Sequence, residues 1–283
     1  MSRRAFLRSC LALGALALLP APAAASFQPS RISVTVSGHG PDVVLIPGLS
    51  SGRGVWSSTV AAVPGYRYHL VQIAGFAGDP ARGNAQGKVA ASVAEEIARY
   101  IAESRLDRPA LVGHSMGGTI AMMVAARHPR LPGKVMVVDM VPAATQLFGL
   151  PGAAPRPLAG FVRDELAGAA VLRRELKSVI GRFGSTDWLD SRNDAGVVSR
   201  SVEELMVTDL TPELPRIEAP LTVLYACPEP VALTKGAIDR LYLRAYAPQR
   251  GARLIRIARS GHNIMADQPA VFQRMLRAFL AGR

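Results

Sequence analysis

Three short runs of almost entirely apolar residues constrain the fold of this chain more than any other feature of its sequence. They are residues 43–46, 135–138 and 221–225. A strand with one face in water alternates apolar and polar side chains, whereas a strand covered on both faces is apolar at nearly every position. We therefore expect these runs to be inner strands of a parallel sheet that helices cover on both sides.

Further strands and helices are expected to alternate along the chain. Four more short runs are rich in β-branched residues and bounded by Gly, Pro or charged residues, and helical periodicity lies between the runs. The additional strands are expected at residues 32–36, 68–73, 110–112 and 254–257, and the helices at 89–102, 116–127, 235–245 and 270–280. This alternation predicts an α/β fold with a doubly wound, mostly parallel sheet.

One region interrupts the alternation and predicts a helical cap. Residues 142–212 contain no convincing strand but carry two amphipathic patterns, at 158–180 and around 195–206. We expect them to form an insertion across the sheet, so that the core comprises residues 26–141 and 213–283. The chain has 283 residues, of which 49% are hydrophobic and 19% charged, a composition typical of a well-packed globular protein rather than a disordered one.

The first 25 residues have the pattern of a cleavable export signal. Arg3 and Arg4 precede Phe6 and Leu7, and an apolar stretch too short for a comfortable membrane span leads to small residues that end at Ala25. The arginine and Phe-Leu pairs resemble the twin-arginine signal of bacterial proteins exported after folding; an ordinary secretory signal is the alternative. We expect cleavage after Ala25, engagement of the twin-arginine export machinery, and a periplasmic or secreted protein without a stable membrane span.

The formal net charge of +12 does not by itself predict a nucleic-acid partner. Basic residues such as Arg173, Arg174 and Lys177 are interleaved with acidic ones, and no basic run alternates with aromatic residues. The sequence also lacks the Cys/His spacing of zinc sites and the glycine pattern of dinucleotide-binding loops. We expect a solvated basic surface, no nucleic acid, no metal and no organic cofactor.

The sequence Gly113-His114-Ser115-Met116-Gly117 lies between an expected buried strand and an expected helix. In that position a Gly-x-Ser-x-Gly pattern forms a sharp strand-to-helix turn that exposes the serine hydroxyl. Glycine is needed at 113 and 117 because side chains there would strike the neighbouring helix and strand. The helix N-terminus favours negative charge beside the serine. We expect Ser115 to be a nucleophile; the alternative is a tight turn with a passive serine.

Over nearly all of its length after residue 25, the chain resembles the α/β-hydrolase superfamily. The resemblance is carried by this turn and by three other segments, residues 45–49, 74–78 and 260–262. It implies a serine hydrolase in which the loop after the first core strand supplies a backbone amide to an oxyanion. That loop reads Pro47-Gly48-Leu49 here, where many relatives have His-Gly. Because backbone N–H groups bind the oxyanion, Leu49 and Met116 are the expected donors.

Five histidines are candidates for the general base, and the resemblance favours His262. This residue follows the last expected strand and Gly261, in a loop before the final helix, where the superfamily places its base. The order Ser, acid, His along the chain then holds. The other four are expected in a turn, a strand, a packed position beside Ser115 and a helix end, and they are His39, His69, His114 and His128.

The acid is the point at which this sequence departs from the superfamily. Most relatives carry an Asp after the strand that corresponds to residues 221–225, but here that strand runs into Cys227-Pro228-Glu229. Two candidates follow strands, Glu229 and Asp139. The resemblance supports Asp139, because some members of the superfamily carry their acid after the corresponding strand. Asp139 also comes directly after four apolar residues, so its carboxylate is expected to be partly buried and to need a partner, which His262 would provide. We favour Asp139 over Glu229 as the acid of the triad.

Together these features predict a carboxylesterase. The expected chemistry is two-step acyl transfer through an acyl-enzyme. The cap segment is rich in Leu, Val, Ala and Phe, which favours a small-molecule ester with an apolar acyl or alcohol group. Lipase, thioesterase, polyester depolymerase, perhydrolase and carbon–carbon hydrolase chemistry would use the same residues. A non-catalytic binding protein of the same fold is a further alternative, favoured by the missing Asp after residues 221–225.

Overall fold

A mostly parallel sheet organises the chain. The computed structural model describes residues 27–148, 192–227 and 235–282, and within these ranges the sheet has seven strands in the order β1-β3-β2-β4-β5-β6-β7. Only β1 runs antiparallel to its neighbour, β3. The strands are β1 (Ile32–Ser37), β2 (Asp42–Ile46), β3 (Arg67–Ile73), β4 (Ala110–His114), β5 (Lys134–Val138), β6 (Leu221–Cys227) and β7 (Arg253–Ala258). The predicted fold class and all seven expected strands are confirmed.

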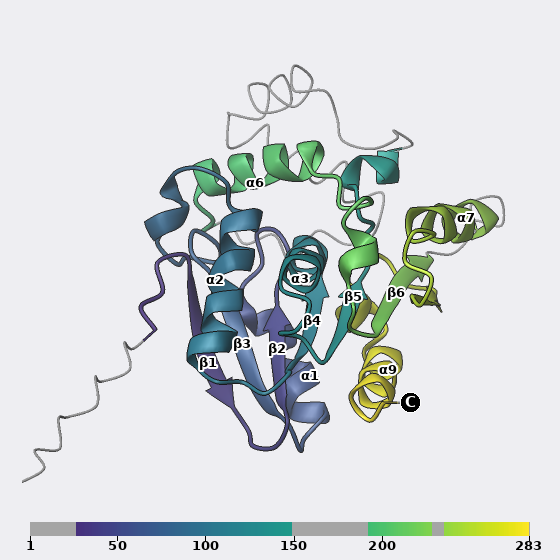
Figure 1. The fold of residues 1–283 in the computed structure, drawn as a ribbon, viewed down its shortest axis with the longest axis horizontal. Helices are drawn as coiled ribbons and strands as arrows, with labels where there is room; N and C mark the ends of the chain where they lie inside the picture. The colour runs from purple at the N-terminus through teal and green to yellow at the C-terminus, as the bar shows by residue number, and fades with distance from the viewer. Residues whose placement is uncertain (1–26, 149–191, 228–234, 283) are drawn as a thin grey trace, which may run out of the picture.

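Helices cover both faces of the sheet (Figure 1). The α-helices are α1 (Ser57–Ala62), α2 (Ala90–Glu103), α3 (Met116–Arg127), α6 (Ala195–Val207), α7 (Lys235–Ala245), α8 (Ile264–Asp267) and α9 (Pro269–Leu280). Adjacent residues of β2 face opposite sides: Val44 and Ile46 pack with α2 and α3, whereas Val43 and Leu45 pack with α9. Burial on both faces explains why this strand is apolar throughout.

The described residues of the expected cap are 142–148 and 192–212. They include α6, which lies across the carboxyl ends of the strands in Figure 1. Glu204 of α6 is buried, and its carboxylate accepts hydrogen bonds from the backbone amides of Val89, Ala90 and Ala91 at 2.6–2.8 Å. These amides begin α2, where a helix leaves N–H groups without intrahelical partners and favours negative charge. Glu204 therefore fastens α6 to the core.

Several short elements were not predicted. They are α1, α8 and the 3-10 turns at Arg53–Trp56, Arg82–Ala85, Ala144–Phe148 and Leu214–Arg216. Each has three to six residues, too few for helical periodicity to emerge. The expected helix at 158–180 and the export signal lie outside the described residues, so the cap boundaries stay a prediction. No helix among the described residues is long and apolar enough to cross a membrane.

Candidate active site

Ser115 occupies a strained turn between β4 and α3. Its backbone angles are φ 53° and ψ −123°, a region that side-chain-bearing residues rarely adopt and that is found at functional sites. A Cβ on Gly113 would lie 2.0 Å from the Gly117 carbonyl oxygen, and one on Gly117 would lie 2.3 Å from the Ile46 carbonyl oxygen. Glycine is therefore required at both positions. Ser115 remains partly exposed while its neighbours are buried, as the sequence pattern predicted.

The loop after β2 runs directly against this turn. A Cβ on Gly48 would lie 3.0 Å from His114 Nδ1 and 3.1 Å from Ser115 Cβ, so any side chain at this position would crowd the turn of Ser115. Leu49 follows in the same loop, and Met116 is the first residue of α3, where backbone amides have no intrahelical acceptor. Both expected oxyanion donors thus belong to backbone segments that adjoin Ser115.

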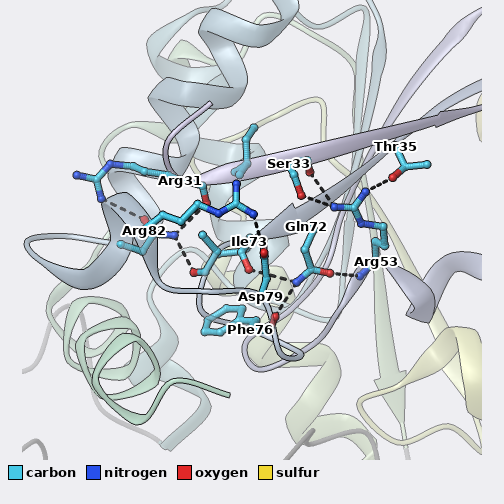
Figure 2. A network of polar contacts seen from close by, with 12 residues as sticks. Arg31, Ser33, Thr35, Arg53, Gln72, Ile73, Phe76, Asp79 and Arg82 are labelled. Atoms are coloured by element: carbon cyan, nitrogen blue, oxygen red, sulfur yellow. Dashed lines mark hydrogen bonds and ion pairs between the residues drawn. The ribbon is translucent and has the colours of Figure 1, made fainter. Parts of the chain in front are cut away.

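A buried glutamine for which the sequence predicted no role contacts the 3-10 turn that follows Leu49 in the chain (Figure 2). Gln72 of β3 accepts a hydrogen bond from the Arg53 amide at 3.0 Å and donates to the Phe76 carbonyl at 2.9 Å. The Arg53 side chain in turn donates to the hydroxyls of Ser33 and Thr35 in β1. These contacts hold the loop after β2 to the loop after β3 and to the edge of the sheet.

The structure brings His262 and Asp139 together. His262 lies in the loop after β7, and its Nδ1 is 2.7 Å from Oδ2 of Asp139, which directly follows β5. The other carboxylate oxygen, Oδ1, accepts hydrogen bonds from the Ala226 amide at 2.8 Å and the Tyr242 hydroxyl at 2.9 Å. Asp139 and His262 are only 6% and 8% exposed. Glu229, the alternative acid, lies outside the described residues.

Ser115 and Asp139 are adjacent across neighbouring strands. The Ser115 amide donates to the Val138 carbonyl at 2.9 Å, and the Asp139 amide donates to the Leu224 carbonyl at 2.7 Å. The carboxyl ends of parallel strands meet at one edge of a sheet, where α/β proteins place their chemistry. The described residues at this edge therefore combine a hydroxyl, an imidazole and a carboxylate beside a helix N-terminus, a set suited to nucleophilic catalysis with general base assistance.

His114 has a more specific place than the packing position that the sequence predicted. It is fully buried, and its Nε2 donates to the backbone carbonyl of His262 at 2.9 Å. A carbonyl only accepts, so Nε2 carries the hydrogen. Burial, followed by the nearby charge of His262, lowers the pKa of His114 to about 3. His114 therefore stays neutral and fixes the backbone that carries His262; only its position beside Ser115 hinted at this role.

The buried His114 predicts that the protein loses stability in acid. In the unfolded chain the imidazole of His114 binds a proton below a pKa of 6.5, whereas in the folded state this imidazole stays neutral. Neutral His114 thus makes its full contribution to the free energy of unfolding above pH 6.5. This contribution is lost as pH falls toward 3, at up to about 1.4 kcal/mol per pH unit. We expect Tm to fall more steeply from pH 6.5 to 4.5 in wild type than in His114→Gln, measured by thermal unfolding. Parallel Tm curves would contradict this role.

Comparisons with known proteins find a matching family and related enzymes. The Alpha/beta hydrolase family matches residues 43–274. A pimeloyl-[acyl-carrier protein] methyl ester esterase of Aeromonas hydrophila is 31% identical over 194 residues, covering 68% of this chain and 71% of that protein. The enzyme of the same name from Vibrio cholerae is 28% identical over 228 residues, covering 75% and 85%.

Solved structures share the fold. An esterase from Exiguobacterium antarcticum superposes with a TM-score of 0.70 at 20% identity, covering 88% of this chain and 95% of that one. A thermophilic esterase from Thermogutta terrifontis gives 0.67 at 18% identity, covering 89% and 93%. At these identities the likeness concerns the fold alone.

Proposed function

This chain belongs to the alpha/beta hydrolase family and is an esterase-like hydrolase, and we propose that it cleaves carboxylic esters through a triad of Ser115, His262 and Asp139. The observation that carries the proposal is the 2.7 Å contact between His262 Nδ1 and Asp139 Oδ2, at the strand ends beside the strained turn of Ser115. A buried carboxylate on one imidazole nitrogen leaves the other nitrogen to act as a base.

In the proposed mechanism Nε2 of His262 takes the proton from the Ser115 hydroxyl as its oxygen attacks the ester carbonyl. Asp139 holds the Nδ1 hydrogen and stabilises the imidazolium that forms. The backbone amides of Leu49 and Met116 donate to the oxyanion of the tetrahedral intermediate, and the dipole of α3 adds to this stabilisation. His262 then protonates the leaving alcohol, and water releases the acid from the acyl-enzyme by the same steps.

The proposed substrates are small-molecule esters with an apolar acyl or alcohol group. The relatives named above are methyl ester esterases, so an ester of a small alcohol is the first to test. The assay measures p-nitrophenol release from p-nitrophenyl acetate and butyrate, and acid release from methyl esters of short and medium chain length. We expect turnover of both kinds by the protein that begins at residue 26. Folded protein inactive on the whole panel would contradict an esterase.

We extend the proposal to cell location: residues 1–25 direct export by the twin-arginine route. In support, Arg3 and Arg4 precede Phe6 and Leu7, and a short apolar stretch then leads to small residues that end at Ala25. In a bacterial host, replacing Arg3 and Arg4 together by Lys should retain the uncleaved precursor in the cytoplasm, measured by fractionation. Unchanged export would contradict this route.

A further inference from the structure

We propose that Tyr242 is a positioning residue of this active site, whose hydroxyl orients the Asp139 carboxylate toward His262. The inference rests on the triad proposed above. Tyr242 comes from α7 and lies more than a hundred positions after Asp139 in the chain, and its hydroxyl donates to Asp139 Oδ1 at 2.9 Å. It does not contact the reacting atoms, so its effect on the reaction passes through Asp139.

The two oxygens of Asp139 have separate partners. Oδ1 accepts from the Ala226 amide at 2.8 Å and from Tyr242, while Oδ2 faces Nδ1 of His262 at 2.7 Å. A carboxyl group rotates readily about its last bond, because that torsion has broad minima. Two donors on one oxygen fix this rotation and leave the other oxygen for the imidazole. The Ala226 donor is backbone, so Tyr242 is the side-chain donor that can be removed.

Tyr242 is itself held in place. Its ring stacks on Tyr225 of β6, with centroids 4.4 Å apart and planes at 18°, and runs nearly parallel to Tyr246, at 6.4 Å and 8°. The side chain is almost fully buried. Burial and then the charge of Asp139 raise the pKa of Tyr242 well above its usual value, so the hydroxyl keeps its proton and donates. Packing thus fixes the ring before any substrate binds.

Tyr246, the residue directly after α7, supplies a matched control. The Tyr246 hydroxyl donates to the Met140 carbonyl at 2.7 Å. Tyr246 is a buried tyrosine of the same stack, four positions after Tyr242. Its hydroxyl contacts backbone next to Asp139 and not the carboxylate. Tyr→Phe at either position keeps the ring and removes one buried hydroxyl, so that general loss of stability should be similar in both variants.

The experiment compares Tyr242→Phe and Tyr246→Phe, each with Asp139 intact and as Asp139→Asn, on a p-nitrophenyl ester. We expect Tyr242→Phe to lower kcat about tenfold, as loss of a hydrogen bond to a charged group predicts, with KM unchanged. Tyr246→Phe should stay within twofold of wild type. In the Asp139→Asn background Tyr242→Phe should cause no further loss, because residues that act as a unit are not additive.

Wild-type kcat in Tyr242→Phe, or an equal loss in Tyr246→Phe, would overturn the positioning role. A full tenfold further loss in the Asp139→Asn background would also overturn it, because Tyr242 would then act independently of the carboxylate. Failure of the triad itself has a different signature: Asp139→Asn alone would retain full activity. Thermal unfolding of each variant establishes that the folded protein is being compared.

Discussion

Replacing Ser115 by alanine is expected to lower kcat on a p-nitrophenyl ester by roughly 10⁴- to 10⁶-fold, the range found when single members of a catalytic triad are removed. The oxyanion amides and the substrate-binding surface remain, so KM should change little. Alanine has the same Cβ as serine at the strained φ of 53°, and the strand and helix around it are unchanged. The fold should therefore persist, with a Tm close to that of wild type.

Ser201→Ala is the matched control for this loss. Ser201 is a buried serine whose hydroxyl donates to the Val197 carbonyl within α6. Its removal should leave kcat within about threefold of wild type, since it takes away one local hydrogen bond. More than 1% of wild-type kcat in purified Ser115→Ala would mean that Ser115 is not the nucleophile.

The second large effect is expected at Asp139: changing it to asparagine should lower kcat about 10⁴-fold, as in a triad whose Asp is replaced by Asn. The Ala226 amide and the Tyr242 hydroxyl both donate to Oδ1, so they would hold the oxygen of the new amide. Its NH₂ group would then face His262 Nδ1. The ring hydrogen would move to Nε2, the atom that must accept the Ser115 proton.

Glu229→Gln tests the alternative acid directly. We expect it to retain kcat within about threefold, because the contact that orients His262 comes from Asp139. Both variants are assayed on the same ester, with Tm as the measure of folding. Loss of activity in Glu229→Gln together with full activity in Asp139→Asn would refute the assignment of Asp139.

The sheet could be predicted from the sequence because burial on both faces makes a strand apolar along its length. β2 and β5 pack against helices on both faces and are apolar at nearly every position, so the existence of these strands and their parallel topology could be inferred from the pattern of residues alone. The glycines around Ser115 were equally informative, since a Cβ at either would overlap backbone atoms. Asp139 was favoured partly because some members of the superfamily carry their acid there and partly because a carboxylate that ends a buried strand needs a partner.

The contacts that support the site and the cap have no comparable pattern in the sequence. Tyr242 meets Asp139 across 103 positions, and Glu204 meets the first amides of α2 across 113 to 115. Such pairings are set by tertiary packing, and neither residue stands in a motif with a fixed spacing. Gln72 lies in β3, and nothing in the residue pattern of that strand distinguishes it as a supporting residue. The contacts of these side chains are therefore evident only in the folded structure.

The central claim is that Ser115 is an activated nucleophile, and the most direct test is covalent labelling with a fluorophosphonate probe mapped by mass spectrometry. The protein that begins at residue 26 is labelled beside Ser115→Ala and a heat-denatured sample. We predict one adduct per chain, located on Ser115 and absent from both controls. Folded wild-type protein that takes no label, or that is labelled at another residue, would contradict the account.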